Sequence, residues 1–109
     1  MPLFLIQGAY SPERIQEMIR DPDPVGGAPA MMEGSVKPIA NKFVGGSFRD
    51  AWLTFGEYDF VAIVELQNSV DAVAFSMALS KTGYYKSVKT MVLLSNADGR
   101  DALKKAAAL

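Results

Sequence analysis

The sequence contains no cysteine and no histidine. Their absence excludes Ser-His-Asp and Cys-His catalysis, thiolate chemistry, and a zinc ion or haem held by these residues. Disulfides cannot form, which suits a reducing compartment. Gly26-Gly27 matches no phosphate-binding loop, and Asp21 and Asp23 lack the rest of a calcium loop. The sequence therefore indicates neither a metal site nor a cofactor site.

Charge runs and long apolar runs are also missing. Lys and Arg number 11 against 12 Asp and Glu, and cations lie close together only at Lys86/Lys89 and Lys104/Lys105. Phosphate backbones need clustered cations, so nucleic acid is not an expected partner. No apolar run approaches the roughly 20 residues that span a membrane, and Leu3–Ile6 lacks the flanks of a signal peptide. We expect a cytoplasmic protein with no membrane partner.

The length of the chain bounds its organisation. At 109 residues the sequence has room for one domain, which we place over residues 1–109. Half of the residues are hydrophobic and 21% are charged, which is typical of a globular protein. The apolar share is large for so small a body. Surplus apolar surface of this kind often forms a subunit interface or lines a pocket.

Turn residues and apolar spacing divide the chain into short elements. The expected strands are Leu3–Ile6, Ser47–Phe55, Tyr58–Leu66 and Ser87–Leu94. The expected helices follow Ser11-Pro12, begin near Ser35, follow Asn68-Ser69 and cover Ala97–Leu109. Glycines are predicted to end the first strand, the second helix and the third helix, at Gly8, Gly45-Gly46 and Gly83. The third helix has a predicted apolar stripe made of Val70, Val73, Ala74 and Met77.

The strand at 58–66 is apolar on both sides. Alternate residues share a face, which separates Phe60, Ala62, Val64 and Leu66 from Val61, Ile63 and Glu65. Both faces are therefore expected to be covered. The order β-α-β-β-α-β plus a C-terminal helix is the ferredoxin-like α+β motif, with one antiparallel sheet and helices on one face. A second copy would cover the other face, which predicts a homodimer or a higher oligomer of dimers.

A short signature lies at the predicted hairpin. The stretch Thr54-Phe55-Gly56-Glu57-Tyr58-Asp59-Phe60-Val61, followed by Ala62-Ile63-Val64-Glu65, resembles that of the GYD domain family, named for its Gly-Tyr-Asp residues. The resemblance covers most of the chain and implies a dimeric α+β barrel, but no particular reaction. The segment from Asp21 to Gly34 looks longer and less helical than in similar members. It is either a lid over a pocket or, as we favour, a variable loop.

Three residues are candidates for catalysis. Tyr58 and Asp59 pair a phenol with a carboxylate beside a turn, where they could act as acid and base. Alternatively, Gly56 permits the turn, Asp59 bonds backbone amides and Tyr58 packs its ring. Glu65 would be a base with a raised pKa if it lines the space between two sheets. At the strand end it would instead be solvated or paired with a lysine.

Four residues are candidates for ligand binding. Gln7 and Thr90 are polar interruptions in apolar strands, and they line a cavity or reach solvent. An aromatic set forms either a wall for a flat ligand or part of the core or a subunit interface; its members are Tyr10, Phe48, Trp52 and Phe55. The candidates are Gln7, Tyr10, Trp52 and Thr90.

Three functions are compatible with these residues. The leading hypothesis is a small homo-oligomeric protein that binds a small apolar or aromatic ligand in the inter-sheet cavity of a dimer. The second is a cofactor-independent oxygenase or isomerase acting on an activated aromatic or enolic substrate, which rests on analogy between folds. The third is a structural or interaction module. The sequence identifies neither the ligand nor the reaction.

Overall fold

A computed structural model describes residues 2–22 and 35–109, so most of the segment from Asp21 to Gly34 lies outside the described residues. The order of the elements agrees with the sequence prediction. The elements are β1 (Leu3–Tyr10), α1 (Pro12–Arg20), α2 (Val36–Asn41), β2 (Ser47–Leu53), β3 (Phe60–Glu65), α3 (Ser69–Ser80), β4 (Tyr85–Leu93) and α4 (Asn96–Ala108).

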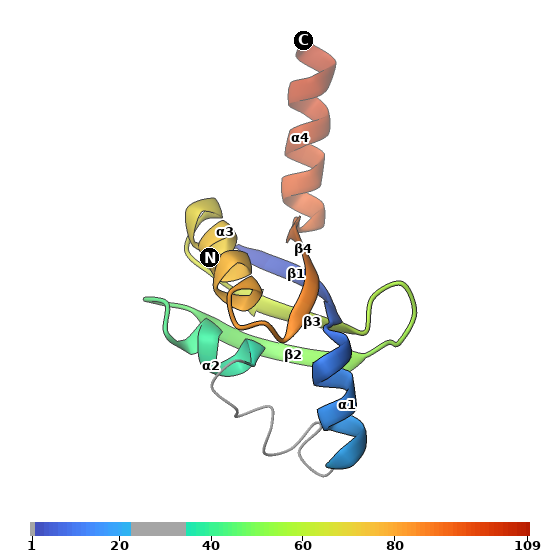
Figure 1. Ribbon diagram of the computed structural model, residues 1–109. Coiled ribbons are helices and arrows are strands. Elements are labelled where there is room, and N and C mark those ends of the chain that lie inside the picture. Colours follow the sequence, from blue (N-terminus) through green and yellow to red (C-terminus); the bar gives the residue numbers. More distant parts are fainter. Residues whose placement is uncertain (1, 23–34) are drawn as a thin grey trace.

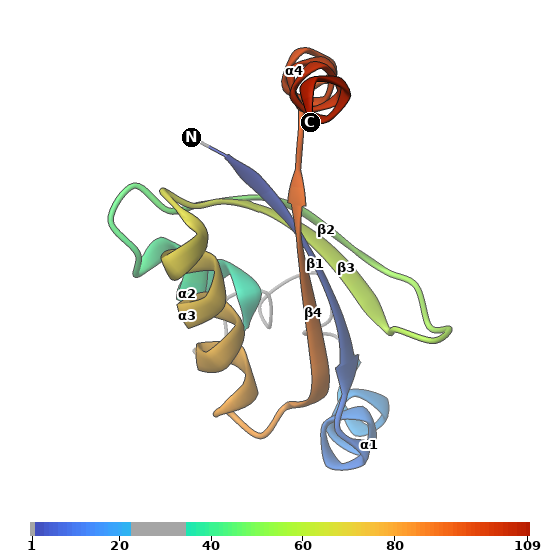
Figure 2. The ribbon, with the colours of Figure 1, turned by 90° about the horizontal axis from the view of Figure 1, so that it is seen from above.

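The four strands form one antiparallel sheet in the order β2-β3-β1-β4, with β1 hydrogen-bonded to both β3 and β4. Figure 2 shows α2 and α3 together on one side of this sheet. This arrangement is the predicted ferredoxin-like α+β fold. In Figure 1, α1 lies beyond the end of β1, and α4 projects away from the sheet after β4. Neither α1 nor α4 has a buried residue.

The core lies between the sheet and the two helices that cover it. Residues of β3 alternate between buried and half-buried, which confirms the two predicted faces of this strand. The buried side chains of β3 pack against α2 and α3, and buried side chains of β1 belong to the same core. The core cluster consists of Phe4, Ile6, Val36, Ile39, Ala40, Phe60, Ala62, Val64, Leu66, Ala72, Phe75 and Leu79.

Side-chain caps fix where three of the helices begin. The Ser11 hydroxyl accepts the N–H of Arg14 at 3.2 Å, and Pro12 occupies the first helical position. Asn68 and Ser95 cap α3 and α4 in the same way, each accepting the N–H three positions further on. Each bond satisfies one of the amide groups that a helix N-terminus leaves without an intrahelical partner.

Gly8 does not end the first strand, because β1 continues to Tyr10. Gly8 pairs with Phe60 on β3, and a Cβ at Gly8 would lie 2.2 Å from the Phe60 Cε1 atom. The glycine therefore leaves room for a buried aromatic ring to lie across β1. The sequence prediction was wrong here because it took Gly8 as the end of the strand, whereas a glycine inside a strand can mark a close approach by another group.

The predicted tight turn at Gly56-Glu57 is a longer loop between Leu53 and Phe60. Its one residue with positive φ is Phe55, at 45°, whereas nothing lies within 4 Å of a Cβ built on Gly56. Gly56 could adopt a positive φ without strain, but the loop position that has a positive φ is occupied by Phe55. The backbone closes through a hydrogen bond from the Thr54 N–H to the Asp59 carbonyl at 2.8 Å.

The apolar stripe predicted on α3 does not face the core. Val70, Val73, Ala74 and Met77 are exposed, and the buried residues of this helix are Ala72, Phe75 and Leu79. Both sets recur at helical spacing, so α3 is apolar on two sides. One side packs on the sheet, and the other is left on the surface of the chain.

Candidate functional site

One face of the sheet, which we call the open face, lies opposite α2 and α3 (Figure 2). Cross-strand partners share a face of a sheet, so the pairing register identifies its side chains. They are Leu3, Leu5 and Gln7 of β1, Val61, Ile63 and Glu65 of β3, Lys89, Met91 and Leu93 of β4, and Ser47, Asp50 and Trp52 of β2. Two large apolar side chains of this face are strongly exposed, Trp52 at 51% and Met91 at 42%.

Two predicted ligand-binding residues come together on the open face. Val61 is the cross-strand partner of Gln7 on one side and of Trp52 on the other. Because neighbouring strands lie about 4.8 Å apart, Gln7 and Trp52 are separated by roughly 10 Å along one row. Lys89 continues this row on β4. The row therefore combines an indole ring, an amide and an ammonium group across the four strands.

The centre of the open face is apolar. Leu5 on β1 lies between its cross-strand partners Ile63 and Met91. The polar groups of the face surround this centre. Glu65 lies at the end of β3 and forms an ion pair with Arg49. The partner that the sequence analysis considered for a solvated Glu65 was a lysine, and the structure places an arginine there instead.

Thr90, by contrast, faces the helices. Its cross-strand partner is the buried Ile6, and its hydroxyl is hydrogen-bonded to the Ser76 hydroxyl on α3. It therefore lies on the opposite side of the sheet from Gln7 and Trp52. The sequence could not show this, because the face that a residue of an edge strand occupies depends on its register with the neighbouring strand.

Tyr10 belongs to an aromatic cluster on the covered side of the sheet. Its ring centroid lies 5.4 Å from that of Phe60 and 5.6 Å from that of Tyr85. Burial raises the pKa of both tyrosines above the ordinary value, so both phenols are held neutral. The predicted aromatic wall is not formed, since Trp52 and Phe55 are exposed while Phe48 packs against the core cluster.

Asp59 of the signature ties the β2–β3 loop to the end of β1. Its carboxylate accepts the Tyr10 N–H at 2.9 Å, and its own N–H donates to the Gly8 carbonyl at 2.8 Å. The carbonyl of Tyr58 accepts the Thr54 hydroxyl at 2.8 Å. These bonds correspond to the structural alternative for the signature, in which the carboxylate holds backbone amides.

The three catalytic candidates do not share a site. Asp59 precedes β3 and Glu65 ends it. Six residues of extended chain separate their backbones by about 20 Å. Glu65 is paired with Arg49 and Asp59 with the Tyr10 amide. A substrate of ordinary size could therefore contact only one of these carboxylates, and a role for either in catalysis remains a prediction.

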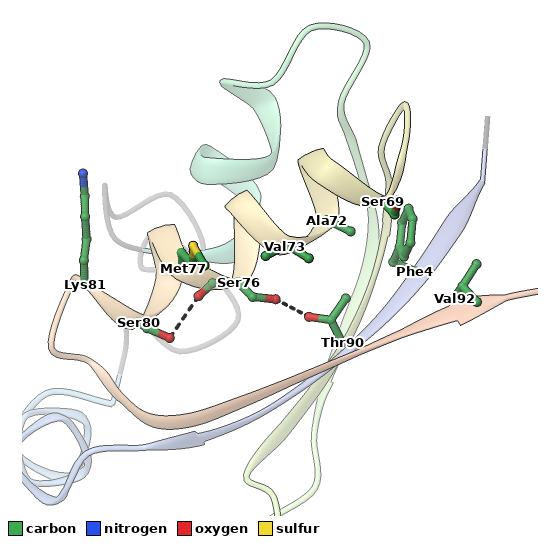
Figure 3. Close-up of a pocket in the computed structure, with 10 residues that line it drawn as sticks. All are labelled: Phe4, Ser69, Ala72, Val73, Ser76, Met77, Ser80, Lys81, Thr90 and Val92. Carbon is green, nitrogen blue, oxygen red and sulfur yellow. Dashed lines mark hydrogen bonds between the residues drawn. The ribbon is translucent and has the colours of Figure 1, made fainter.

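A feature that the sequence analysis missed is a groove between α3 and the edge strand β4 (Figure 3). We call it the α3–β4 groove; it has a volume of about 710 Å³. Its wall is the outer apolar side of α3, and the Ser76–Thr90 hydrogen bond crosses its floor. The lining residues are Phe4, Ser69, Ala72, Val73, Ser76, Met77, Ser80, Lys81, Thr90 and Val92. The second apolar stripe on α3 was the signal in the sequence that could have revealed it.

Neither a metal-binding cluster nor a membrane-spanning helix is found in residues 2–22 and 35–109. In these ranges, no three carboxylates lie where they could hold a metal ion together. The helices described there are too short or too polar for a membrane span.

Comparison with known proteins places this geometry in a family. A family model described as the GYD domain matches residues 4–103. Curated proteins give no significant match to the sequence.

Among solved structures, one described as the crystal structure of FFRP-DM1 is 19% identical. The match covers 86% of this chain and 100% of that one, with a TM-score of 0.53. A hypothetical protein, PHS023, from Pyrococcus horikoshii is 18% identical over 88% of this chain and 93% of that one, with a TM-score of 0.49. At such identities the first structure shows a shared fold and nothing about activity.

Proposed function

This chain belongs to the GYD domain family, and we propose that it works as a homodimer whose two open faces enclose a small apolar or aromatic ligand. The observation that carries the proposal is the open face itself. It is apolar at its centre, and none of the described helices packs on it. Large apolar patches left on a small domain commonly mark a binding surface.

A second copy is the occupant that this face fits. Two sheets pack about 10 Å apart with their apolar faces together, and the twist of each sheet is accommodated by a rotation of about 30°. A two-fold axis presents the same face twice, so both copies bury Leu5, Ile63 and Met91 at once. The polar groups surrounding this centre, including the Arg49–Glu65 ion pair, would form the rim of the interface.

The row of Trp52, Val61, Gln7 and Lys89 suggests the chemistry of the ligand. An indole ring offers a flat surface for another ring, and an amide offers both a donor and an acceptor. A cavity lined mainly by apolar side chains with a few polar groups is typical of small-molecule sites. The ligand class is therefore a flat, mostly apolar molecule with at least one hydrogen-bonding group.

The enzymatic alternative has less support. Its candidate residues Tyr58, Asp59 and Glu65 lie at opposite ends of β3, and the two carboxylates already have partners. Acid–base catalysis requires groups within hydrogen-bond reach of one reacting centre. A binding role requires no such convergence, which is why we favour it over catalysis.

Native mass spectrometry of protein purified without denaturation, followed by a denaturing run, tests the proposal. We expect a dimer, or a multiple of it, with additional mass that disappears on denaturation. Ile63→Lys places a charge at the centre of the open face, and it should abolish both the additional mass and the association of subunits through that face. Glu57→Gln makes the same change in net charge in an exposed loop and should leave the dimer intact. A wild-type monomer would overturn the whole proposal. A dimer without additional mass would refute the part of the proposal that concerns a bound ligand.

A further inference from the structure

The helix α4 is left without support by its own chain. None of its residues is buried, and Leu103 is 73% exposed. Isolated helices shorter than about 12–15 residues are marginal in water, and α4 has 13 residues. Most helices of this length are stabilised by packing an apolar side against another element. Such packing is not provided by the described part of this chain (Figure 1).

One side of α4 is suited to packing. Leu103 lies four residues after Gly99 and three before Ala106, so the three share one side of the helix. The small neighbours on either side of Leu103 allow another helix to approach closely. The two ends of α4 carry opposite charges, with Asp98 in the first turn and Lys105 in the last.

The α3–β4 groove offers the complementary surface. Two of its lining residues, Val73 and Met77, are 54% and 65% exposed. Among the residues that line the groove, Lys81 is the one with a charged side chain. The groove follows α3, whose 12 residues extend for about 18 Å, close to the roughly 20 Å of a 13-residue helix.

We propose that α4 of a second copy docks in the α3–β4 groove, so that each of two copies supplies a helix to the other. This exchange buries the exposed side of α3 and the Leu103 side of α4 at the same time. It uses the opposite side of the sheet from the open face and does not rest on the function proposed above. In a two-fold pair each copy offers the same groove and the same helix, which is a self-complementary arrangement.

The direction of α4 distinguishes a second copy from its own chain. In Figure 3, Ser69 and Val92 lie at one end of the groove and Lys81 at the other. Because β4 ends on the Val92 side, an α4 that turned back over its own groove would run parallel to α3. The macrodipoles of α3 and α4 would then be parallel, which is the unfavourable arrangement for two neighbouring helices.

A helix from a second copy is free to lie antiparallel to α3. In this direction Asp98 approaches Lys81, which gives an attraction between opposite charges. The macrodipoles of the two helices are then antiparallel, which is also favourable. Both effects favour an exchanged helix over one that folds back.

The absence of cysteine allows a direct test. Full-length Met77→Cys and Leu103→Cys proteins, distinguished by the size of a tag, are mixed, oxidised mildly and separated without reductant. We expect a disulfide between chains of different size. Lys105→Cys in place of Leu103→Cys is the matched control, because residue 105 lies on the far side of α4, and its yield should be several-fold lower.

Several results would overturn the proposal. The first is that no disulfide forms between chains, and the second is that the control gives as much disulfide as Leu103→Cys. The third is that a chain carrying both cysteines forms only a disulfide within itself. A second measurement addresses the direction of the helix. Lys81→Asp and Asp98→Lys should each lower the yield of the disulfide, and the two together should restore it. Failure of the double variant to recover would refute the antiparallel arrangement.

Discussion

The carboxylate of Asp59 makes a contact that can be measured. It accepts the Tyr10 N–H at 2.9 Å and so ties the β2–β3 loop to the end of β1, 49 residues away in the sequence. Asp59→Ala removes the acceptor and leaves the half-buried amide of Tyr10 without this partner. Asp59→Asn retains a carbonyl oxygen in the same place but removes its charge. The two variants therefore separate the loss of the bond from the loss of charge assistance.

The expected magnitudes follow from the geometry. A hydrogen bond to a charged group contributes about 1.5–3 kcal/mol, and leaving a buried donor unpaired costs about 1–3 kcal/mol. We expect Asp59→Ala to lower the free energy of unfolding by about 2 kcal/mol. Asp59→Asn should lower it by about 1 kcal/mol, because neutral hydrogen bonds are roughly half as strong as charge-assisted ones. Each 1 kcal/mol corresponds to about 4–8 °C in Tm for a domain of this size.

Urea denaturation monitored by circular dichroism, at one fixed protein concentration, measures these differences. Fixed concentration matters because any association of subunits would add to the apparent stability. Glu57→Ala is the control, since this residue lies exposed in the same loop, and it should change stability by less than about 0.5 kcal/mol. If Asp59→Ala were no less stable than Glu57→Ala, the structural role assigned to Asp59 would be refuted.

Other positions give further predictions. Gly8→Ala should lower the free energy of unfolding by about 1–3 kcal/mol in urea denaturation, and Phe60→Leu in the same chain should recover part of it, because the new Cβ would otherwise overlap the ring. Phe55→Gly should raise Tm by several degrees, since Phe55 has positive φ and an exposed side chain, whereas Gly56→Ala should be nearly neutral. Burial raises the pKa of Tyr85, so the contribution of Tyr85 to stability should be constant below about pH 10 and fall above it, as the unfolded chain loses that proton first. Tyr85→Phe should reduce that fall by up to about 1.4 kcal/mol per pH unit, and an unchanged slope would contradict it.

The fold was predictable because its signals are local. Ser11 and Asn68 were predicted as caps and cap helices in the structure, and Pro12 follows Ser11 at the first helical position. The alternation in β3 also identified its buried side. These features depend on neighbours a few residues apart, so the sequence contains the information needed to place them.

The predictions that were wrong concern features that are determined by packing between distant parts of the chain. Either apolar side of α3 could have faced the sheet, and the large buried residue Phe75 decided for one of them. Gly8 was predicted to end the first strand because the ring of Phe60, 52 residues away, is not visible in the local sequence. The face of Thr90 depends on its pairing with Ile6. Each decision rests on a contact between distant residues, which periodicity does not encode.

The two proposed surfaces lie on opposite sides of one sheet, and together they determine the possible sizes of an assembly. A single self-complementary interface closes at a dimer. If the open faces pair two copies and α4 is exchanged between different pairs, two distinct two-fold interfaces coexist, and the smallest closed assembly is a tetramer. Ile63→Lys, which disrupts the open face, should then leave dimers held by α4, and Leu103→Asp should leave dimers held by the sheets. If α4 is instead exchanged within the sheet-paired dimer, the wild type stays a dimer, and Leu103→Asp weakens it without changing its size. The native mass of these two variants and of the wild type separates the two arrangements.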